Sequence, residues 1–468
     1  MSARRRLVLV NPMNPARTGL TVNRTSRFPP LGLGQVAALT PRNWDVELID
    51  ENWEPFRYRP ADLVGLTAFT AAAPRAYEIA RRYRAERVPV VMGGIHASMC
   101  PDEALEHVDS VVTGEAESAW PALMRDFEEA RLQRIYQGSW LDLAGLPFPR
   151  RDIFNPRYLF ASVQTSRGCP MDCEFCSVTA FNGRRYRRRP SDEVLKELES
   201  IPQKMIFFVD DNLIGYGHGS QEAVLALFRG MVERRLDKWW FCQASVNFAD
   251  DEETLRWAAR AGCKMVFLGL EAIDTEALRT ANKKLNLSRG VDSYARVFRR
   301  IHKAGIGVLG AFIFGLDGDT HVLMKNRCDY MIRSGIDVMQ ATYLTPLPGT
   351  RLFSRYQADD RLLKLRFPLD WAEYDMTGVI HRPTDVDPRQ LEETMWSITS
   401  RIYAPPVLVW KALRAGLTTR DPIVAMFVWN SNLNYRRVAF ASCRRCRDAR
   451  AASHAREGCH RASEFVGI

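Results

Sequence analysis

The sequence predicts an α/β protein with two successive parallel sheets and a mainly helical C-terminal region. Short apolar runs alternate with helical patterns before and after a proline-rich segment, and such alternation is typical of parallel sheets covered by helices. Three cysteines, Cys169, Cys173 and Cys176, stand in one loop after the first strand of the second series. The 468 residues have room for two or three domains.

Residues 1–140 predict a doubly wound sheet. The expected strands are Leu7–Val10, Val46–Asp50, Leu63–Phe69, Val88–Met92 and Ser110–Thr113, with helical patterns at Pro74–Arg84 and Pro101–Glu106 between them. Ligands of such sheets bind beyond the carboxyl ends of the strands. The residues expected there are Thr67, Thr70, Gly93, Gly94, His96, Gly114 and Glu115. His96 has two interpretations, because it could contact a cofactor or hydrogen-bond locally.

Residues 141–157 contain Pro147, Pro149 and Pro156 and predict a linker. The second series of strands occupies residues 158–365. We expect strands at Leu159–Gln164, Lys204–Val209, Trp239–Ser245, Met265–Leu270, Val308–Phe314 and Val338–Leu344. Six strand–helix units favour a partial barrel whose ligands gather at the carboxyl ends of its strands. Candidate residues near those ends are Asp210, Asp211, Gln243, Ser245, Glu271 and Gly310.

The cysteine loop carries the most specific signal. Cysteine thiolates are the usual ligands of iron–sulfur clusters, and three of them can hold three irons of a four-iron cube. The fourth iron then stays open to substrate or cofactor. A zinc site or buried free thiols are the alternatives, but zinc usually takes paired C-x2-C ligands, and no second pair lies near this loop.

At Thr165 to Cys176 the sequence resembles the radical S-adenosylmethionine (SAM) enzymes. The resemblance implies that the three cysteines hold a [4Fe-4S] cluster whose open iron binds SAM. It places Phe175 and the backbone of Gly310 near the adenine. It also implies SAM contacts for Asp210, Asp211, Gln243, Ser245 and Glu271, and an external electron donor such as flavodoxin or ferredoxin.

The first domain is similar to the cobalamin-binding domain that precedes the barrel in one group of these enzymes. The similar segments are Pro29–Leu33, Met92–Ser98 and Thr113–Glu117. The resemblance implies cobalamin contacts at the strand-end residues named above. The Asp-x-His-x-x-Gly signature is absent, since Asp50-Glu51-Asn52-Trp53 follow the second strand. No histidine of that motif would therefore ligate cobalt, and a cofactor-free domain is the alternative.

The last hundred residues predict helices over 366–440 and a basic tail at 441–468. Two apolar stretches, Pro405–Leu413 and Ile423–Trp429, are typical of core, but could also line a channel for an apolar substrate or touch a membrane surface. Two interpretations stay open for the tail, a zinc or auxiliary cluster site and a chance pattern. Its candidate ligands are Cys443, Cys446, His454, Cys459 and His460.

Composition limits the partners and the compartment. The net charge of +10 is partly due to five arginines between Arg184 and Arg189, which we interpret as local support or phosphate contacts rather than nucleic-acid binding. Ten cysteines without a secretory signal indicate a reducing, cytoplasmic setting. No run approaches the ~18 apolar residues of a membrane span, so any membrane contact is expected to be peripheral.

The resemblance implies an enzyme that forms a 5′-deoxyadenosyl radical and transfers a methyl group from methylcobalamin to an unactivated carbon. A ring cyclase or oxidoreductase of the tetrapyrrole type is the main alternative. A tRNA methylthiotransferase is disfavoured because Cys100 is the only cysteine before Cys169. A metal-binding regulator of nucleic acid would leave the cysteine loop unexplained. The substrate is expected to be a small molecule, possible classes being a lipid, an isoprenoid and a tetrapyrrole.

Overall fold

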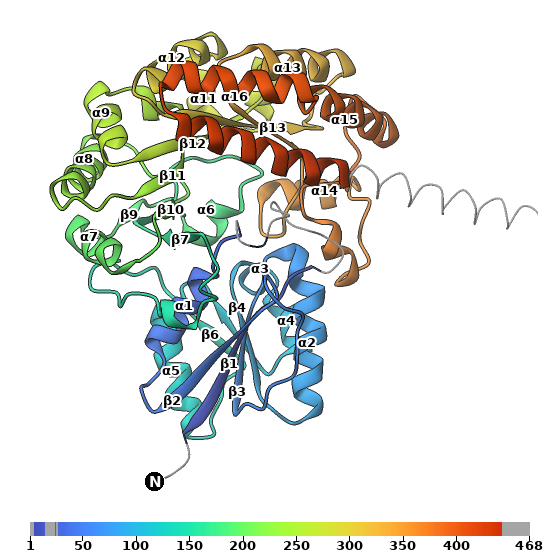
Figure 1. Cartoon of the computed structure of the whole chain (residues 1–468). Helices are drawn as coiled ribbons and strands as arrows, with labels where there is room; N and C mark the ends of the chain where they lie inside the picture. The colour runs from blue at the N-terminus through green and yellow to red at the C-terminus, as the bar shows by residue number, and fades with distance from the viewer. Residues whose placement is uncertain (1–3, 15–23, 25–26, 442–468) are drawn as a thin grey trace, which may run out of the picture.

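The computed structural model describes residues 4–14, 24 and 27–441. These residues form two six-stranded parallel sheets, one in each of two domains that lie end to end, with the N-terminal domain in blue (Figure 1). The strand order of the first sheet is β2-β1-β3-β4-β5-β6, so the direction of winding reverses between β1 and β3. Its strands are β1 Arg5–Asn11, β2 Trp44–Asp50, β3 Leu63–Thr67, β4 Val90–Gly93, β5 Ser110–Thr113 and β6 Ile135–Gln137.

Helices cover both faces of the first sheet, as the alternating sequence predicted. On one face α1 and α5 bury Leu33 and Leu123 against Leu7 and Leu9 of β1. On the other face α2, α3 and α4 pack against Val8, Val64 and other strand residues. The helices are α1 Leu31–Leu39, α2 Ala73–Ala85, α3 Ile95–Met99, α4 Pro101–His107 and α5 Ala116–Glu128.

The second sheet has the order β14-β13-β12-β11-β10-β7, with all strands parallel and neighbouring strands consecutive. This is the expected partial barrel of six strands, and each predicted strand is confirmed within three residues. The strands are β7 Phe160–Val163, β10 Met205–Phe208, β11 Trp239–Ala244, β12 Cys263–Glu271, β13 Gly307–Phe314 and β14 Val338–Tyr343.

The outer face of the barrel carries the larger core. Alternate strand residues such as Phe208, Trp240 and Val266 are buried there against the surrounding helices. The helices of this domain are α6 Ser177–Asn182, α7 Ser191–Ser200, α8 His218–Glu233, α9 Glu252–Arg260, α10 Thr275–Thr280, α11 Lys284–Arg289, α12 Tyr294–Lys303, α13 His321–Arg333 and α14 Arg351–Ala358.

After the barrel, the chain returns to the first domain before it forms the terminal helices. Trp371 and Tyr374, in and beside the short helix η6 Leu369–Glu373, are buried with the core of the first domain. The chain then forms α15 Pro388–Ile402, α16 Pro405–Thr419 and a helix over 422–441, drawn in orange to red (Figure 1). In the part of the chain that the structure describes, no helix has the length and apolar character needed to cross a bilayer.

Candidate active site at the junction of the two domains

The cysteine loop leaves β7 and is closed by a short hairpin. Its two strands are β8 Ser166–Arg167 and β9 Arg187–Arg188. Gly168 has φ = +87°, and a Cβ there would stand 2.3 Å from the carbonyl oxygen of Arg185, so this turn requires glycine. The loop presents Cys169, Cys173 and Cys176 half-buried and outside any disulfide.

The donor set of this loop fits a cluster better than a single ion. Burial raises the pKa of all three thiols, that of Cys176 to about 12. Among the described residues, no three histidine, cysteine or carboxylate side chains are close enough to hold one metal ion. Thiolates of a four-iron cube bind separate irons and so stand further apart than the ligands of one ion. Three thiols spread along one glycine-closed loop therefore suit a cluster.

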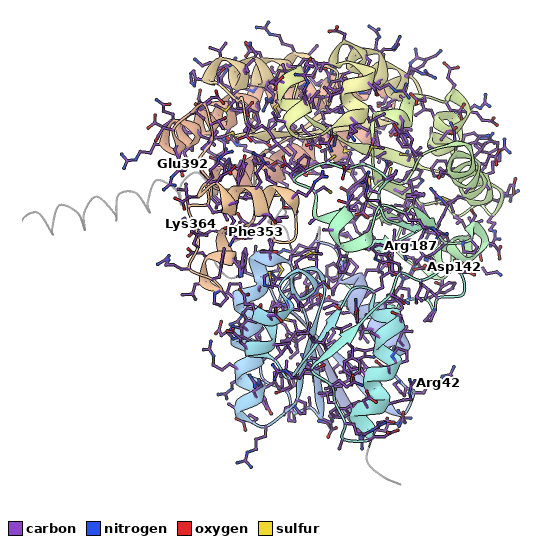
Figure 2. The ribbon with its side chains drawn as sticks, turned by 180° about the vertical axis from the view of Figure 1, so that it is seen from behind. Arg42, Asp142, Arg187, Phe353, Lys364 and Glu392 are labelled. Carbon is purple, nitrogen blue, oxygen red and sulfur yellow. The ribbon has the colours of Figure 1, made fainter. Side chains whose placement is uncertain are left out.

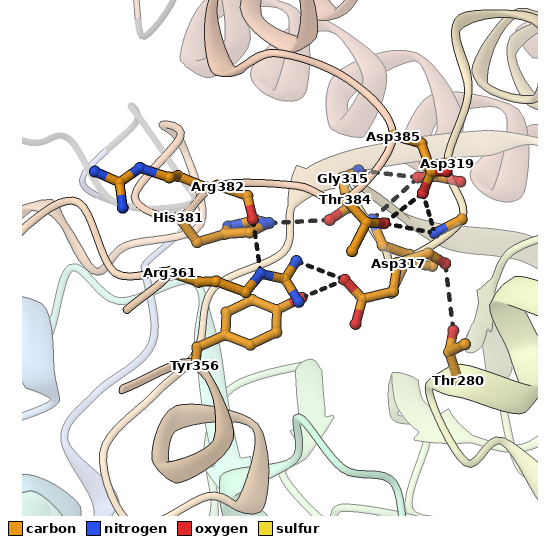
Figure 3. A network of polar contacts seen from close by, with 12 residues as sticks. Thr280, Gly315, Asp317, Asp319, Tyr356, Arg361, His381, Arg382, Thr384 and Asp385 are labelled. Carbon is orange, nitrogen blue, oxygen red and sulfur yellow. Dashed lines mark hydrogen bonds and ion pairs between the residues drawn. The ribbon is translucent and has the colours of Figure 1, made fainter. Parts of the chain in front are cut away.

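A network of arginines holds the outer side of the cysteine loop. Arg355 on α14 donates two hydrogen bonds to the carboxylate of Glu174, at 2.8 and 2.9 Å. Arg355 also donates to Asp317 at 2.9 Å. Arg361 donates to the same carboxylate at 2.6 Å (Figure 3). Glu174 lies between two of the cysteines, so this network fixes the loop to the segment after β13.

Asp210 anchors the start of the loop from inside. Its carboxylate is completely buried and accepts hydrogen bonds from the backbone N–H and the hydroxyl of Thr165, at 3.1 and 2.7 Å, and from the hydroxyl of Ser166. Burial raises its pKa. These contacts make Asp210 a positioning residue for the loop, because all its close partners belong to the segment before the first cysteine. Its contact with SAM stays a prediction.

The other residues at the second and third strand ends lie beside the loop. Asp211 accepts a hydrogen bond from Asn182 at 3.0 Å, and burial raises its pKa to about 6. The hydroxyl of the half-buried Ser245 accepts a hydrogen bond from the side-chain amide of Asn212 at 3.2 Å. Gln243 points to the concave face of the sheet, because its neighbours Cys242 and Ala244 are buried on the convex face. Contacts of these residues with SAM stay predictions.

Glu271 ends β12 in a left-handed conformation and pairs with Lys283. Its φ is +62°, and Lys283 Nζ donates to Oε1 at 2.6 Å. Burial opposes the charge of Lys283, but Glu271 and the thiols of Cys173 and Cys176 raise its pKa. No sequence pattern pointed to Lys283. A partly buried cation beside two of the cysteines is therefore a new feature of the site.

The two residues predicted to lie near the adenine, Gly310 and Phe175, both have packing contacts. Gly310 lies inside β13 rather than at its end, and a Cβ there would stand 3.0 to 3.1 Å from the side chain of Ile336. A side chain at this position would therefore crowd Ile336 on the convex face. Phe175 packs against a satellite core that contains Ala281, Leu352 and Tyr356. Its proximity to adenine stays a prediction.

In the first domain, small half-buried residues line the carboxyl edge of the sheet. Gly94 has φ = +90°, and a Cβ there would stand 2.4 Å from Thr67 Oγ1. Gly93 has more room, and its nearest atoms would be 3.6 Å from a Cβ. Phe69 stands just beyond β3 with 80% of its surface exposed, the largest fraction among the exposed large hydrophobic residues of the described chain. A flat group bound at this edge would cover that ring, so the edge fits a planar cofactor.

The remaining residues predicted at this edge have structural contacts. Thr70 is buried and begins a short 3-10 helix. Gly114 has φ = +69°, and a Cβ there would stand 2.6 Å from the carbonyl oxygen of Gly138. Its N–H donates to Ser98 Oγ at 3.0 Å. Both residues shape the loops at the edge, and their contacts with cobalamin stay predictions.

His96 lies within the first domain and is completely buried. Its Nε2 is 3.1 Å from the hydroxyl of Tyr77 and 3.2 Å from Glu103 Oε1. The single indole N–H of Trp371 is shared between the two carboxylate oxygens of Glu103. This network joins α3 and α4 to the segment that returns from the barrel. These hydrogen bonds agree with the local interpretation of His96, and its contact with cobalamin stays a prediction.

Charged pairs join the cysteine hairpin to the first domain. Arg187 of β9 donates two hydrogen bonds to the carboxylate of Glu115, just beyond β5, and one of them is 2.9 Å long. Arg187 lies where the two domains meet (Figure 2). Arg167 of β8 pairs with Glu117 and lies 3.3 Å from Glu115. The burial of Glu115 opposes its charge, but Arg187 and Arg167 hold its pKa below 4.5. The prediction of local support for the arginine run agrees with these contacts.

The concave face of the barrel carries half-buried phenylalanines. Phe207 and Phe241 stack with ring centroids 4.4 Å apart, and Phe28 from the N-terminal segment packs on both. Phe427 from the helix 422–441 lies 6.5 Å from Phe160. Nearer the carboxyl ends, the same face bears polar side chains such as Gln243. An apolar surface therefore leads toward the cysteine loop.

Two family models match the chain. The B12 binding domain matches residues 17–124, and the radical SAM superfamily matches residues 163–326. The bacteriochlorophyllide d C-12(1)-methyltransferase of Chlorobaculum tepidum is 28% identical over 86% of this chain and 88% of its own length. The hopanoid C-2 methylase of Rhodopseudomonas palustris is 29% identical over 72% of this chain and 66% of its own.

A solved structure shares the fold. The radical SAM methyltransferase TsrM from Kitasatospora setae, with cobalamin and a [4Fe-4S] cluster bound, aligns with a TM-score of 0.64 at 19% identity, over 84% of this chain and 89% of that chain. Together with the two domain matches, these relatives define the class of enzyme. The chain belongs to the radical SAM enzymes that carry a B12-binding domain.

Proposed function

We propose that this enzyme transfers a methyl group from SAM, through cobalamin, to an unactivated carbon of a hydrophobic small molecule. One observation carries the proposal. The carboxyl edges of the two sheets face a common junction, because Arg187 and Arg167 of the cysteine hairpin bind Glu115 and Glu117 just beyond β5. The cluster site and the edge that fits a planar cofactor are thus held side by side, as a methyl relay between two cofactors requires.

The residues present suit three bound groups. Cys169, Cys173 and Cys176 would hold the [4Fe-4S] cluster, and the edge near Thr67, Gly93 and Phe69 would hold cobalamin. SAM would lie between them, near Glu271 and Asp211. When bound, these groups supply a 5′-deoxyadenosyl radical for hydrogen abstraction and a methyl group for transfer to the substrate carbon.

The chain itself would position these groups. Arg355 and Asp210 fix the cysteine loop from opposite sides, through Glu174 and Thr165. Lys283 offers a positive charge beside Cys173 and Cys176, which offsets negative charge that gathers on a reduced cluster. The phenylalanines of the concave face would bind an apolar substrate.

The substrate class follows from that apolar surface and from the relatives. The named relatives act on a bacteriochlorophyllide and a hopanoid. We infer a substrate of similar apolar character, for which tetrapyrrole, isoprenoid and lipid are the candidates. We also infer an external one-electron donor of the flavodoxin or ferredoxin type, a cytoplasmic setting and peripheral contact with a membrane.

Isotope transfer tests the proposal. The full chain, reconstituted anaerobically with iron, sulfide and cobalamin, would be given SAM with a ¹³C-methyl group, a reductant and pooled apolar extract from the source cells. We expect a product heavier by one labelled methyl group, with 5′-deoxyadenosine formed alongside. A product that lacks the label but has lost hydrogen or gained a ring would instead establish the cyclase alternative.

A further inference from the structure

Helix α16 carries an apolar stripe on its outward face. Trp410, Leu413 and Leu417 are 55%, 59% and 76% exposed. Their spacing of three and four residues places them on one side of the helix, within about 60° of each other. Leu408 and Ala415, on the opposite side, are buried in the core. Helix α16 is thus apolar on two sides, one buried in the core and the other exposed.

The helix 422–441 extends this surface. Met426 and Trp429 are exposed, whereas Val424 and Val428 of the same helix are buried against the barrel. The two helices touch, since a Cβ on Gly416 would stand 3.3 Å from the Cβ of Ala425. We call the exposed residues of this helix pair the terminal apolar face. Its members are Val409, Trp410, Leu413, Leu417, Met426 and Trp429.

The charged residues of this helix pair are almost all positive, although Lys411, Arg414 and Arg436 are held at the core by hydrogen bonds to backbone carbonyls. Between residues 405 and 441 the sequence has five basic residues and one acidic residue, Asp421. Asp421 is engaged in an ion pair with Lys264 at 2.7 Å. Arg437 is exposed and falls on the outward side of its helix by helical spacing, and Arg420 is exposed just beyond the end of α16. An occupant of this face should therefore be apolar beneath a negatively charged layer.

An anionic lipid surface has this composition. Tryptophan prefers the boundary between headgroups and acyl chains, and arginine is attracted to anionic headgroups. Paired helices with tryptophan and leucine on one side and flanking arginines suit shallow insertion in the plane of a bilayer. A second copy of this chain would bring the same arginines against each other, so like charge disfavours it.

The face also lies close to the concave side of the barrel. The helix 422–441 places Phe427 6.5 Å from Phe160, and the hydroxyl of Tyr435 donates to Gln340 at 3.2 Å. One helix thus contacts the substrate-facing surface on one side and solvent on the other. Docking here would bring lipid-dissolved molecules next to the barrel.

We propose that the terminal apolar face docks this enzyme on anionic membranes. The docking is a property of the protein surface and does not depend on the proposed methyl transfer. Helix pair 405–441 lies in the headgroup region, with Trp410, Leu417 and Trp429 inserted and Arg420 and Arg437 among the lipid phosphates.

Vesicle sedimentation tests the docking. The reconstituted full chain would be spun with vesicles of phosphatidylglycerol and phosphatidylcholine, or of phosphatidylcholine alone. We expect binding to the anionic vesicles that weakens with salt. The variant Trp410→Ser/Leu417→Ser should lose at least about tenfold in partitioning, because two large apolar side chains no longer insert. The matched control, Val322→Ser/Leu369→Ser, removes two exposed apolar side chains elsewhere and should bind as the parent does.

Three results would overturn the proposal. The first is no sedimentation of the parent with anionic vesicles. The second is an equal loss of vesicle binding in both double variants, or no loss of binding in either of them. The third is a parent dimer in analytical ultracentrifugation that the Trp410→Ser/Leu417→Ser variant converts to monomer, which would assign the face to self-association. Circular dichroism of each variant checks that its fold is intact, and 5′-deoxyadenosine formation without vesicles should be unchanged.

Discussion

Arg187 binds Glu115 across the junction of the two domains, and both side chains are almost completely buried. The two residues are 72 positions apart, one in the hairpin beside the cluster loop and the other just after β5. The pair therefore ties the hairpin of the cysteine loop to the first domain.

Removing one partner should therefore be costly. We expect Arg187→Met to lower the free energy of unfolding by about 1.5–3 kcal/mol, because Glu115 loses its hydrogen-bonded guanidinium and keeps only Arg167, 3.3 Å away, as a charged partner. The double variant Glu115→Gln/Arg187→Met should be more stable than the sum of the single variants predicts. Denaturant unfolding of the four proteins measures this coupling. Strict additivity would show that the two residues act independently.

A second prediction compares two arginines of α14 that both reach the cysteine loop. Arg355 binds both carboxylate oxygens of Glu174. The more exposed Arg351 donates one hydrogen bond to the carboxylate of Asp172 at 3.1 Å and one to its backbone carbonyl at 2.8 Å. A bidentate pair with a carboxylate is stronger than an exposed ion pair. We expect Arg355→Met to lose cluster iron several-fold faster under a chelator, and Arg351→Met to match the parent. Iron release followed by absorbance measures both, and equal rates in the two variants would contradict the assignment.

A third prediction concerns Lys283. Its ammonium lies beside Cys173 and Cys176 and pairs with Glu271. A nearby positive charge favours the reduced, more negative form of a cluster. We expect Lys283→Met to shift the cluster midpoint potential to more negative values. The exposed neighbour provides the control, since Lys284→Met should leave the potential unchanged. Redox titration monitored by electron paramagnetic resonance distinguishes the two outcomes, and an unshifted Lys283→Met would argue against this role.

A fourth prediction is a pH dependence of stability that arises from His381. This histidine is completely buried, its Nε2 donates to the carbonyl of Gly315 at 3.0 Å, and burial lowers its pKa to about 4 (Figure 3). The unfolded chain binds a proton here below pH 6.5, whereas the folded chain does so only near pH 4. Acidification between these values should therefore cost about 3 kcal/mol of stability.

The variant His381→Asn keeps a donor for Gly315 and removes the titration. The difference in unfolding free energy between parent and variant should change between pH 6.5 and 4 and stay constant above pH 7. A difference that is independent of pH would show that His381 is not held neutral in the fold.

The sequence predicted both sheets because each strand is a short apolar run with turn residues at its ends. It missed β6, whose three residues Ile135–Gln137 include a glutamine and carry too little apolar pattern. The return of the chain to the first domain through Trp371 also escaped notice, since it depends on contacts with Glu103, which is 268 positions away. Local periodicity carries no information on such pairs.

The residues of the candidate site were predicted more accurately than the role of each residue. The cysteine loop was identified from spacing alone, but Asp210 and Gly310 were placed by analogy at strand ends. The structure shows that Asp210 binds Thr165 and that Gly310 makes room for Ile336. Lys283 was missed because a lysine between two helices has no distinctive pattern; its importance depends on a fold that brings Glu271 beside it. The tail cysteines Cys443, Cys446 and Cys459 lie outside the described residues.

The most direct test is the release of 5′-deoxyadenosine by the anaerobically reconstituted enzyme, given SAM and a strong reductant. We expect release by the parent, and none by Cys173→Ala, in which one cluster ligand is lost. The buried cysteine variant Cys242→Ala, outside the loop, should retain release. No release from a parent that contains four irons and four sulfides, or undiminished release from Cys173→Ala, would contradict the account.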